Sequence, residues 1–237
     1  MNRSHPFESV LKERRSIRHF TKRVIGDAEI QDILDDAVWA PSPGNAQSWQ
    51  LVVLSEDKSS QVLENFEDRG WSYIYPLLKG VVRRQYGDAD DLVAKTKEFY
   101  GRYLKATGKP RLIFVCGKKS SLREQLMLSS KVLFNGVSPF FDMALGLNDT
   151  LKVHSNLTKA GLANLAYAIT LCAHDRGLAT CIQAAYCNLS EEIVTYLGID
   201  PTLEIFLSIL IGEEDPKRPL TPQVLLDRDE IRTHWIK

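Results

Sequence analysis

Two short segments near the start of the chain combine residue types that suit one ligand. Residues 14–18, with the sequence RRSIR, place three guanidiniums and a hydroxyl close together. Arginine presents a planar fork of donors that matches phosphate oxygens two at a time, and a hydroxyl adds a further donor. Residues 40–49, APSPGNAQSW, form a proline-stiffened loop whose amides complement the edge of a planar heteroaromatic ring. A phosphate-binding segment followed so soon by a ring-binding loop predicts a site for flavin mononucleotide (FMN).

Each segment also has an ordinary structural interpretation. A basic run is often an exposed turn that contacts nothing, but Ile17 and Phe20 are apolar and should hold residues 14–18 against a core. The loop alone is simply a turn in which Gly44 permits a positive φ, and Trp49 suits the core as well as a wall of the ring site. Which of the three arginines bind phosphate, and which pair with acids, is left open.

The composition limits the classes of protein and partner. The 237 residues are enough for one medium-sized domain with a sizeable core, and 25% charged with 44% hydrophobic residues is ordinary for a globular protein. The sequence has 30 basic residues (Lys and Arg) and 30 acidic residues (Asp and Glu), so no overall electrostatic field favours an anionic membrane or nucleic acid. Zero net charge also disfavours nucleic-acid binding by the basic residues within 14–23. No apolar run approaches the roughly 20 residues that span a bilayer, and residues 1–7 lack the apolar core of a signal peptide. We therefore expect a single α+β domain over residues 1–237, located in the cytoplasm, with no nucleic-acid or membrane partner.

Residues that commonly bind metals or form disulfides show no organised spacing. The four cysteines lack CxxC spacing and lie in apolar settings, which favours small buried side chains in a reducing compartment. The five histidines are scattered, so no metal site is expected. No GxGxxG segment follows a predicted strand, which disfavours a Rossmann dinucleotide domain.

The apolar periodicity predicts an alternation of helices and strands that would bring the two segments together. Helices are expected from Phe7, over most of 59–105 and over 122–134. A further helix should begin with an N-cap at Asp27 and stop before Pro41, and another should begin with a cap at Ser190 and end at Gly198. The helix over 158–176 should have Gly177 as its C′ residue. Strands are expected at 51–54, 111–116, 179–185 and 203–211, and the last of these is apolar enough to be central. Residues 140–147 are ambiguous between strand and loop, and the polar tail over 213–237 should wrap over a surface.

Three motifs in order over residues 8–212 resemble the nitroreductase-like flavoprotein family. That family pairs an R-R-S-x-R segment with an A-P-S-x-x-N-x-Q-P-W loop, which stand here at 14–18 and 40–49. Its downstream helix and G-L-G-T-C turn correspond to Asn164-Leu165, Cys172-Ala173 and the GLATC sequence at 177–181. The chain departs from the pattern at Ser48, where proline is usual, and at Ala179, where glycine is usual.

The resemblance implies an α+β sandwich, with a central, mainly antiparallel sheet flanked by helices, in an intertwined homodimer with two interfacial FMN sites. Arg14, Arg15, Ser16 and Arg18 would hold phosphate and ribityl groups, and Ser42, Pro43, Asn45 and Gln47 would come from the other subunit. Ile182, Gln183 and Ala184 would lie beside the ring with backbone amides facing its reactive nitrogen, and Lys217 or Arg218 would complete the phosphate site. Residues 59–160 match no family motif, and that region normally shapes the substrate pocket.

The resemblance also implies the activity, an FMN-dependent NAD(P)H oxidoreductase that reduces nitroaromatics, quinones or related acceptors. NADPH or NADH would bind transiently in the open pocket, transfer hydride to the flavin and leave, after which the acceptor would take the same place. The flavin performs this chemistry, so no catalytic side chain is expected. The alternatives are dehalogenation, enone reduction or flavin fragmentation on the same fold, and a non-catalytic flavin-binding protein.

Overall fold

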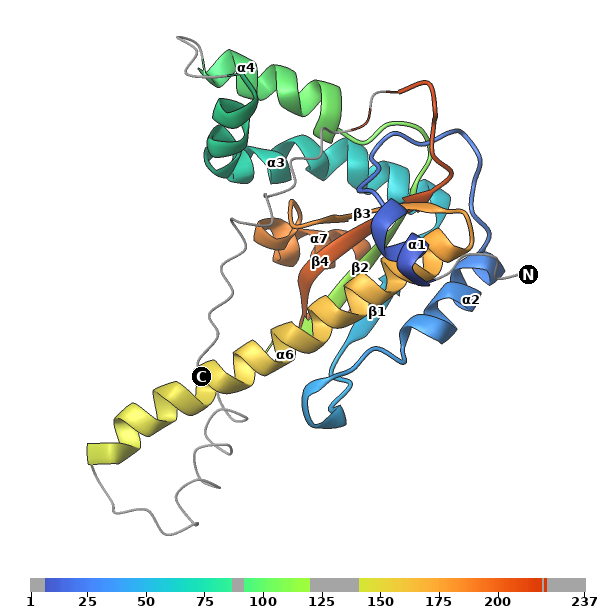
Figure 1. Cartoon of the computed structure of the whole chain (residues 1–237). Coiled ribbons are helices and arrows are strands. Elements are labelled where there is room, and N and C mark those ends of the chain that lie inside the picture. The colour runs from blue at the N-terminus through green and yellow to red at the C-terminus, as the bar shows by residue number, and fades with distance from the viewer. Residues whose placement is uncertain (1–6, 87–91, 120–140, 219, 221–237) are drawn as a thin grey trace, which may run out of the picture.

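The computed structural model describes residues 7–86, 92–119, 141–218 and 220, and its helices cover a four-stranded sheet (Figure 1). This arrangement confirms the predicted α+β class. In chain order the elements are α1 (Phe7–Glu13), α2 (Asp27–Ala37), η1 (Pro43–Asn45), β1 (Gln50–Val53), α3 (Glu56–Tyr86), α4 (Leu92–Phe99), η2 (Tyr100–Leu104), β2 (Arg111–Lys118), α6 (Phe141–Asp175), β3 (Ala179–Gln183), η3 (Cys187–Leu189), α7 (Ser190–Leu197) and β4 (Leu203–Gly212).

The sheet has the order β1-β2-β4-β3, and every neighbouring pair is antiparallel. Strand β4 lies between β2 and β3, as its continuous apolar sequence predicted, because a central strand is covered on both faces. A bulge between Val115 and Cys116 shifts the register of β2 against β4.

Alternate residues of β2 enter two separate hydrophobic cores. Leu112 and Phe114 pack with α3, η2 and α7 on one face of the sheet, while Ile113 and Val115 pack with α2 and α6 on the other. The period of two along a strand produces this division. Figure 1 shows α3 and α4 on one side of the sheet and the long α6 on the other.

Several helix boundaries differ from the predicted ones. Asp27 is the first helical residue of α2 and Gly26 occupies the cap position without a side-chain hydrogen bond. The Ser190 hydroxyl accepts the N–H of Ile205 at 2.8 Å instead of capping α7, because a distant strand end lies within its reach. Helix α6 is much longer than predicted and includes the ambiguous residues 141–147, whereas the helix expected over 122–134 lies outside the described residues.

Among the residues that the structure describes, no helix is long and apolar enough to cross a membrane.

Candidate functional site

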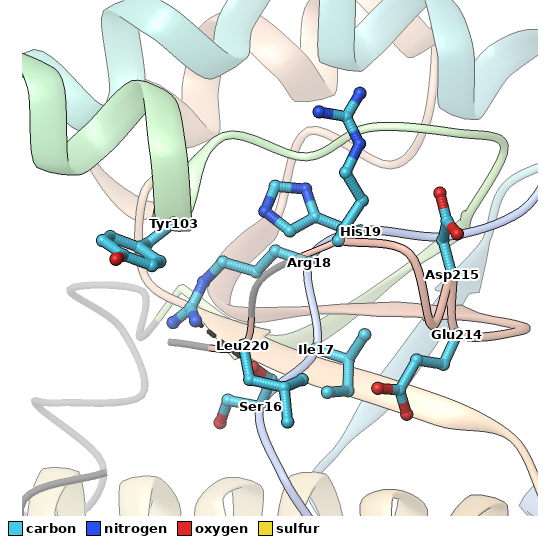
Figure 2. Close-up of a pocket in the computed structure, with 9 residues that line it drawn as sticks. Ser16, Ile17, Arg18, His19, Tyr103, Glu214, Asp215 and Leu220 are labelled. Carbon is cyan, nitrogen blue, oxygen red and sulfur yellow. Dashed lines mark hydrogen bonds between the residues drawn. The ribbon is translucent and has the colours of Figure 1, made fainter. Parts of the chain in front are cut away.

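A surface pocket joins the arginine segment, residues 14–18, to the chain that follows β4 (Figure 2). The expected phosphate-binding residues Ser16, Arg18 and Arg218 line it together. Its full lining, here called the anion pocket, is Ser16, Ile17, Arg18, His19, Tyr103, Glu214, Asp215, Arg218 and Leu220. The structure therefore brings together polar residues about 200 positions apart in sequence.

Backbone hydrogen bonds hold the arginine segment against β3. The N–H of Ile17 donates to the carbonyl of Thr180 at 2.9 Å, in a parallel bridge between Ser16 and Thr180. The side chains of Ile17 and Phe20 are buried in the core on the α3 side. This burial confirms that apolar residues attach the basic segment to the fold.

A turn after β4 brings Arg218 to the pocket. The carbonyl of His19 accepts the N–H of Asp215 at 3.0 Å, and the Asp215 carboxylate accepts the N–H of Lys217 at 3.0 Å. The N–H of Arg218 then donates to the Asp215 carbonyl at 3.1 Å. Of the two candidates left open by the sequence, Arg218 lines the pocket and Lys217 does not.

The arginines have different surroundings. The Arg14 guanidinium lies over the Tyr167 ring at 5.6 Å, and its buried Nε makes no hydrogen bond with any described residue. Arg18 donates to the carbonyl of Ser16 at 3.4 Å, and Figure 2 shows its side chain reaching toward Tyr103. Arg15 is half-buried and lies outside the pocket lining. The buried, unsatisfied Nε of Arg14 is the observation that most directly indicates a missing acceptor.

The amide loop, residues 40–49, maintains its shape with its own side chains. The Ser42 hydroxyl accepts the N–H of Gln47 at 3.0 Å, and the Gln47 side chain donates to Asn45 Oδ1 at 2.9 Å. Gly44, Asn45 and Gln47 all have positive φ, at 61°, 52° and 43°. A glutamine with its backbone in the left-handed region is uncommon, and such backbone strain often occurs at functional positions.

The amide loop packs on α6 and does not contribute to the anion pocket. A Cβ added at Gly161 would lie 3.5 Å from Ser42 Cβ and 3.5 Å from Pro43 Cδ, at ordinary van der Waals distance, so the loop packs directly on α6 at this residue. Asn164 donates to the carbonyl of Pro41 at 3.0 Å. The exposed Asn45 and Gln47 do not reach the pocket within one chain.

The end of β3, expected beside the ring, runs alongside the arginine segment. Ile182 is half-buried and Ala184 is exposed. Gln183 is only 3% exposed, and neither side-chain amide atom has a hydrogen-bond partner among the described residues. The carbonyl of Gln183 accepts the Ser208 hydroxyl at 3.0 Å, so this residue is enclosed in the fold, and Ala184 is the exposed residue at the end of β3.

Sequence reasoning missed Glu67, a buried carboxylate on α3. Glu67 is 3% exposed and accepts the N–H of Ala106 at 2.8 Å. Burial raises the pKa of Glu67 to about 7, although the Ala106 N–H and nearby Lys105 both lower it. Its spacing of four from Leu63 and Trp71 placed it on the apolar stripe of the helix and could have identified it.

The anion pocket offers a phosphate the guanidiniums of Arg18 and Arg218 and the Ser16 hydroxyl, and the carboxylates of Glu214 and Asp215 line it as well. Guanidiniums and a hydroxyl supply hydrogen-bond donors, and phosphate supplies acceptors only. No group of three or more His, Cys, Asp or Glu side chains within the described part of the chain could hold a metal ion. Burial raises the pKa of the Cys181 thiol behind the arginine segment, so it stays protonated at neutral pH.

Comparison with known proteins identifies the family. The model of the Nitroreductase family matches residues 11–213, and the chain belongs to this family. The 4-nitrobenzoate reductase of Pseudomonas putida is 26% identical over 212 residues, which cover 88% of this chain and 86% of that protein.

Solved structures show the same fold. The FMN- and NADPH-dependent nitroreductase NfnB from sphigopyxis sp. strain HMH aligns with a TM-score of 0.63 at 18% identity, over 98% of this chain and 100% of that one. A nitroreductase with bound FMN from Bacteroides fragilis NCTC 9343 aligns with a TM-score of 0.55 at 15% identity, over 98% and 100% of the two chains. The predicted nitroreductase-like fold is thus confirmed.

Proposed function

We propose that this protein is an FMN-dependent NAD(P)H oxidoreductase that reduces nitroaromatic or quinone acceptors. The observation that carries the proposal is the anion pocket, which Ser16, Arg18 and Arg218 line together, and the buried Nε of Arg14 in the same segment has no partner among the described residues. The 4-nitrobenzoate reductase relative supports a nitroaromatic acceptor.

The chain's own residues bind and orient the cofactor. Arg18 and Arg218 would hold the phosphate, Ser16 would donate its hydroxyl, and Arg14 and Arg15 would neutralise the remaining charge. Backbone N–H groups of Ile182–Ala184 would donate to the ring, and Ala184 is the exposed residue of the three. When bound, FMN supplies two-electron hydride transfer between the nicotinamide and the acceptor.

We further propose that the second half of the site comes from a partner subunit, in a homodimer of single-domain chains. The amide loop is exposed and separate from the anion pocket, so Ser42, Pro43, Asn45 and Gln47 would act on a flavin held by another copy. Large apolar side chains are exposed directly after α2 and on α6: Val38 is 41% exposed, Trp39 88%, Val153 56% and Leu157 47%. Such exposure is typical of a surface that another chain covers.

Spectroscopy of the purified protein tests the cofactor and the reaction. We expect a flavin spectrum, or its appearance after incubation with FMN, that is bleached by NADPH or NADH without oxygen. Addition of 4-nitrobenzoate should then restore the oxidised spectrum. Protein that cannot be loaded with FMN contradicts the proposal, while a bound flavin that no nicotinamide reduces supports a flavin-binding protein without this activity.

Mixed dimers test the shared site. One differently tagged chain would carry Arg14→Ala and Arg18→Ala, and the other Asn45→Ala and Gln47→Ala. Each homodimer should bind FMN poorly, whereas the purified heterodimer should regain one intact site and bind one FMN per dimer. Heterodimers that bind no better than either parent would show that both segments act within one chain.

A further inference from the structure

The buried carboxylate of Glu67 lies behind the anion pocket and has no part in the proposed function. It belongs to α3, on the face that packs against the sheet, and it is 3% exposed. Among the described residues no ion pair of Glu67 is found, and a buried carboxylate without one is costly, so its position calls for an explanation.

Glu67 is connected to the arginine segment by consecutive hydrogen bonds. Its carboxylate accepts the N–H of Ala106 at 2.8 Å. The next residue, Thr107, donates its N–H to the carbonyl of Arg18 at 3.0 Å and accepts the N–H of Phe20 at 3.0 Å. Residues 105–109, here called the support loop, therefore hold the backbone of the arginine segment on the side away from β3.

Other contacts make the support loop a rigid connection. The His19 ring lies between Thr107 Oγ1 and the carbonyl of Arg102, both at 3.0 Å. Asp68, next to Glu67, accepts hydrogen bonds from Lys105 at 2.9 Å and from the Tyr100 hydroxyl at 2.5 Å. A displacement of the loop at Ala106 would thus be transmitted to Arg18.

Glu67 and two arginines of the arginine segment also act on the same buried group. The Cys181 thiol has its pKa raised mainly by burial, lowered by the Arg18 and Arg14 guanidiniums and raised by the Glu67 carboxylate. Three other groups face Glu67: Asp68 on α3, Lys105 on the support loop, and the Tyr186 phenol. The pKa of Tyr186 is raised by burial and by the Glu67 charge. Charges that interact through a buried interior are weakly screened by salt.

We propose that Glu67 is a positioning residue of the anion pocket. Glu67 holds Arg18 in place through the support loop, and the protonation of Glu67 is coupled to the binding of a phosphate in the pocket. The coupling rests on the proposed FMN function. Two negative charges repel, so phosphate binding favours the neutral carboxyl, and the protein takes up protons as FMN binds. Conversely, ionised Glu67 weakens phosphate binding as the pH rises.

The variant Glu67→Gln separates charge from position, because glutamine retains an oxygen that accepts the Ala106 N–H but does not titrate. Titration calorimetry in buffers of different ionisation enthalpy counts the protons bound with FMN. At pH 7.5 we expect the wild-type protein to take up about 0.3 proton more than Glu67→Gln. We expect equal affinities at pH 5.5 and about threefold tighter binding by Glu67→Gln at pH 8.5.

The matched control is Asp68→Asn, which removes the adjacent carboxylate on the same helix. Asp68 is 66% exposed, so water screens its charge and the proton count should stay closer to that of the wild type than the count of Glu67→Gln does. Equal counts for wild type and Glu67→Gln would overturn the coupling. A wild-type protein that binds no FMN would instead overturn the proposed function and the coupling with it.

The positioning role is tested without flavin. Glu67→Ala leaves the Ala106 N–H without its acceptor, and we expect amide exchange at Ala106 and Thr107 to accelerate about tenfold, while Glu67→Gln stays near wild type. Where FMN binds, Glu67→Ala should also weaken it about tenfold and Glu67→Gln should not. Exchange rates that are equal in all three proteins would overturn the positioning role, whatever the flavin result.

Discussion

The arginine segment and the amide loop carry complementary halves of the proposed site but depend on different parts of the molecule. The first is held by backbone hydrogen bonds to Thr180, Thr107 and the chain after β4, and its apolar side chains enter the core. The second depends on the Ser42 hydroxyl, on Asn45, and on a close approach to α6. One half is therefore tied to the sheet and the core, while the other keeps its shape through local hydrogen bonds and contact with α6. The proposed site thus joins a pocket built on long-range contacts to a surface loop, where binding residues often lie.

The largest expected effect comes from Gly108→Ala in the support loop. A Cβ there would lie 1.9 Å from the carbonyl oxygen of Phe20, and φ is +83°. Left-handed strain of roughly 1–2 kcal/mol and overpacking of roughly 1–3 kcal/mol together predict a loss of about 4 kcal/mol in the free energy of unfolding. Urea denaturation measures it, with Gly101→Ala as the control, because nothing lies within 4 Å of a Cβ at Gly101. Equal losses in both variants would show that the support loop is not tightly packed against residues 20–21.

A second test uses the pH dependence of stability. The pKa of Glu67 rises from 4.5 to about 7 on folding, so the folded state binds the proton more tightly. The protonated carboxyl therefore contributes to the free energy of unfolding in full below pH 4.5, and this contribution is lost as the pH rises toward 7, by about 3 kcal/mol in total. Unfolding curves of wild type and Glu67→Gln should therefore diverge over that range, with the variant relatively more stable at pH 8. Parallel pH profiles would contradict a buried, titrating Glu67.

The arginine pair gives an effect confined to the ligand. Arg14→Ala with Arg18→Ala should weaken FMN binding about 100-fold, or roughly 2.7 kcal/mol, because the charged hydrogen bond of Arg18 to phosphate would contribute roughly 1.5–3 kcal/mol and Arg14 would add little beyond its charge. Flavin fluorescence titration measures the affinity, and thermal unfolding should change little. Full cofactor occupancy in the double variant would show that these arginines do not bind phosphate.

The smallest effect is expected in the amide loop. Gly44→Ala retains an open environment, since nothing lies within 4 Å of the added Cβ, and meets only the strain of φ +61°. We expect about 1 kcal/mol of destabilisation. Limited proteolysis at residues 40–49 should accelerate more than global unfolding does. A loss as large as that of Gly108→Ala would remove the contrast between the two regions.

The sequence predicted much of the fold because local patterns agree with the tertiary structure. Apolar spacing identified α2 and the later part of α6, and the continuous apolar run identified β4 as central. The failures arise where distant contacts decide. In the sequence Ser190 is an ordinary capping residue, but its hydroxyl accepts the N–H of Ile205 instead. No local sequence pattern indicates this hydrogen bond.

The candidate site was predicted residue by residue, but its spatial organisation was not. Motifs named both Lys217 and Arg218, and only the hydrogen-bonded turn at Asp215 shows which one lines the pocket. Glu67 was overlooked because charged residues lie beside it in the sequence. Its burial becomes visible only once α3 packs against the sheet. The assignment of these residues to FMN stays a prediction.

The meeting of Ser16 with Arg218 has a consequence for biosynthesis. The pocket needs both ends of the described chain, so it does not exist while the ribosome still holds the region after β4. Contacts of such long sequence separation also form late in folding. On the proposed function, the phosphate of the cofactor can be bound only after the region beyond β4 has been synthesised and folded against the arginine segment.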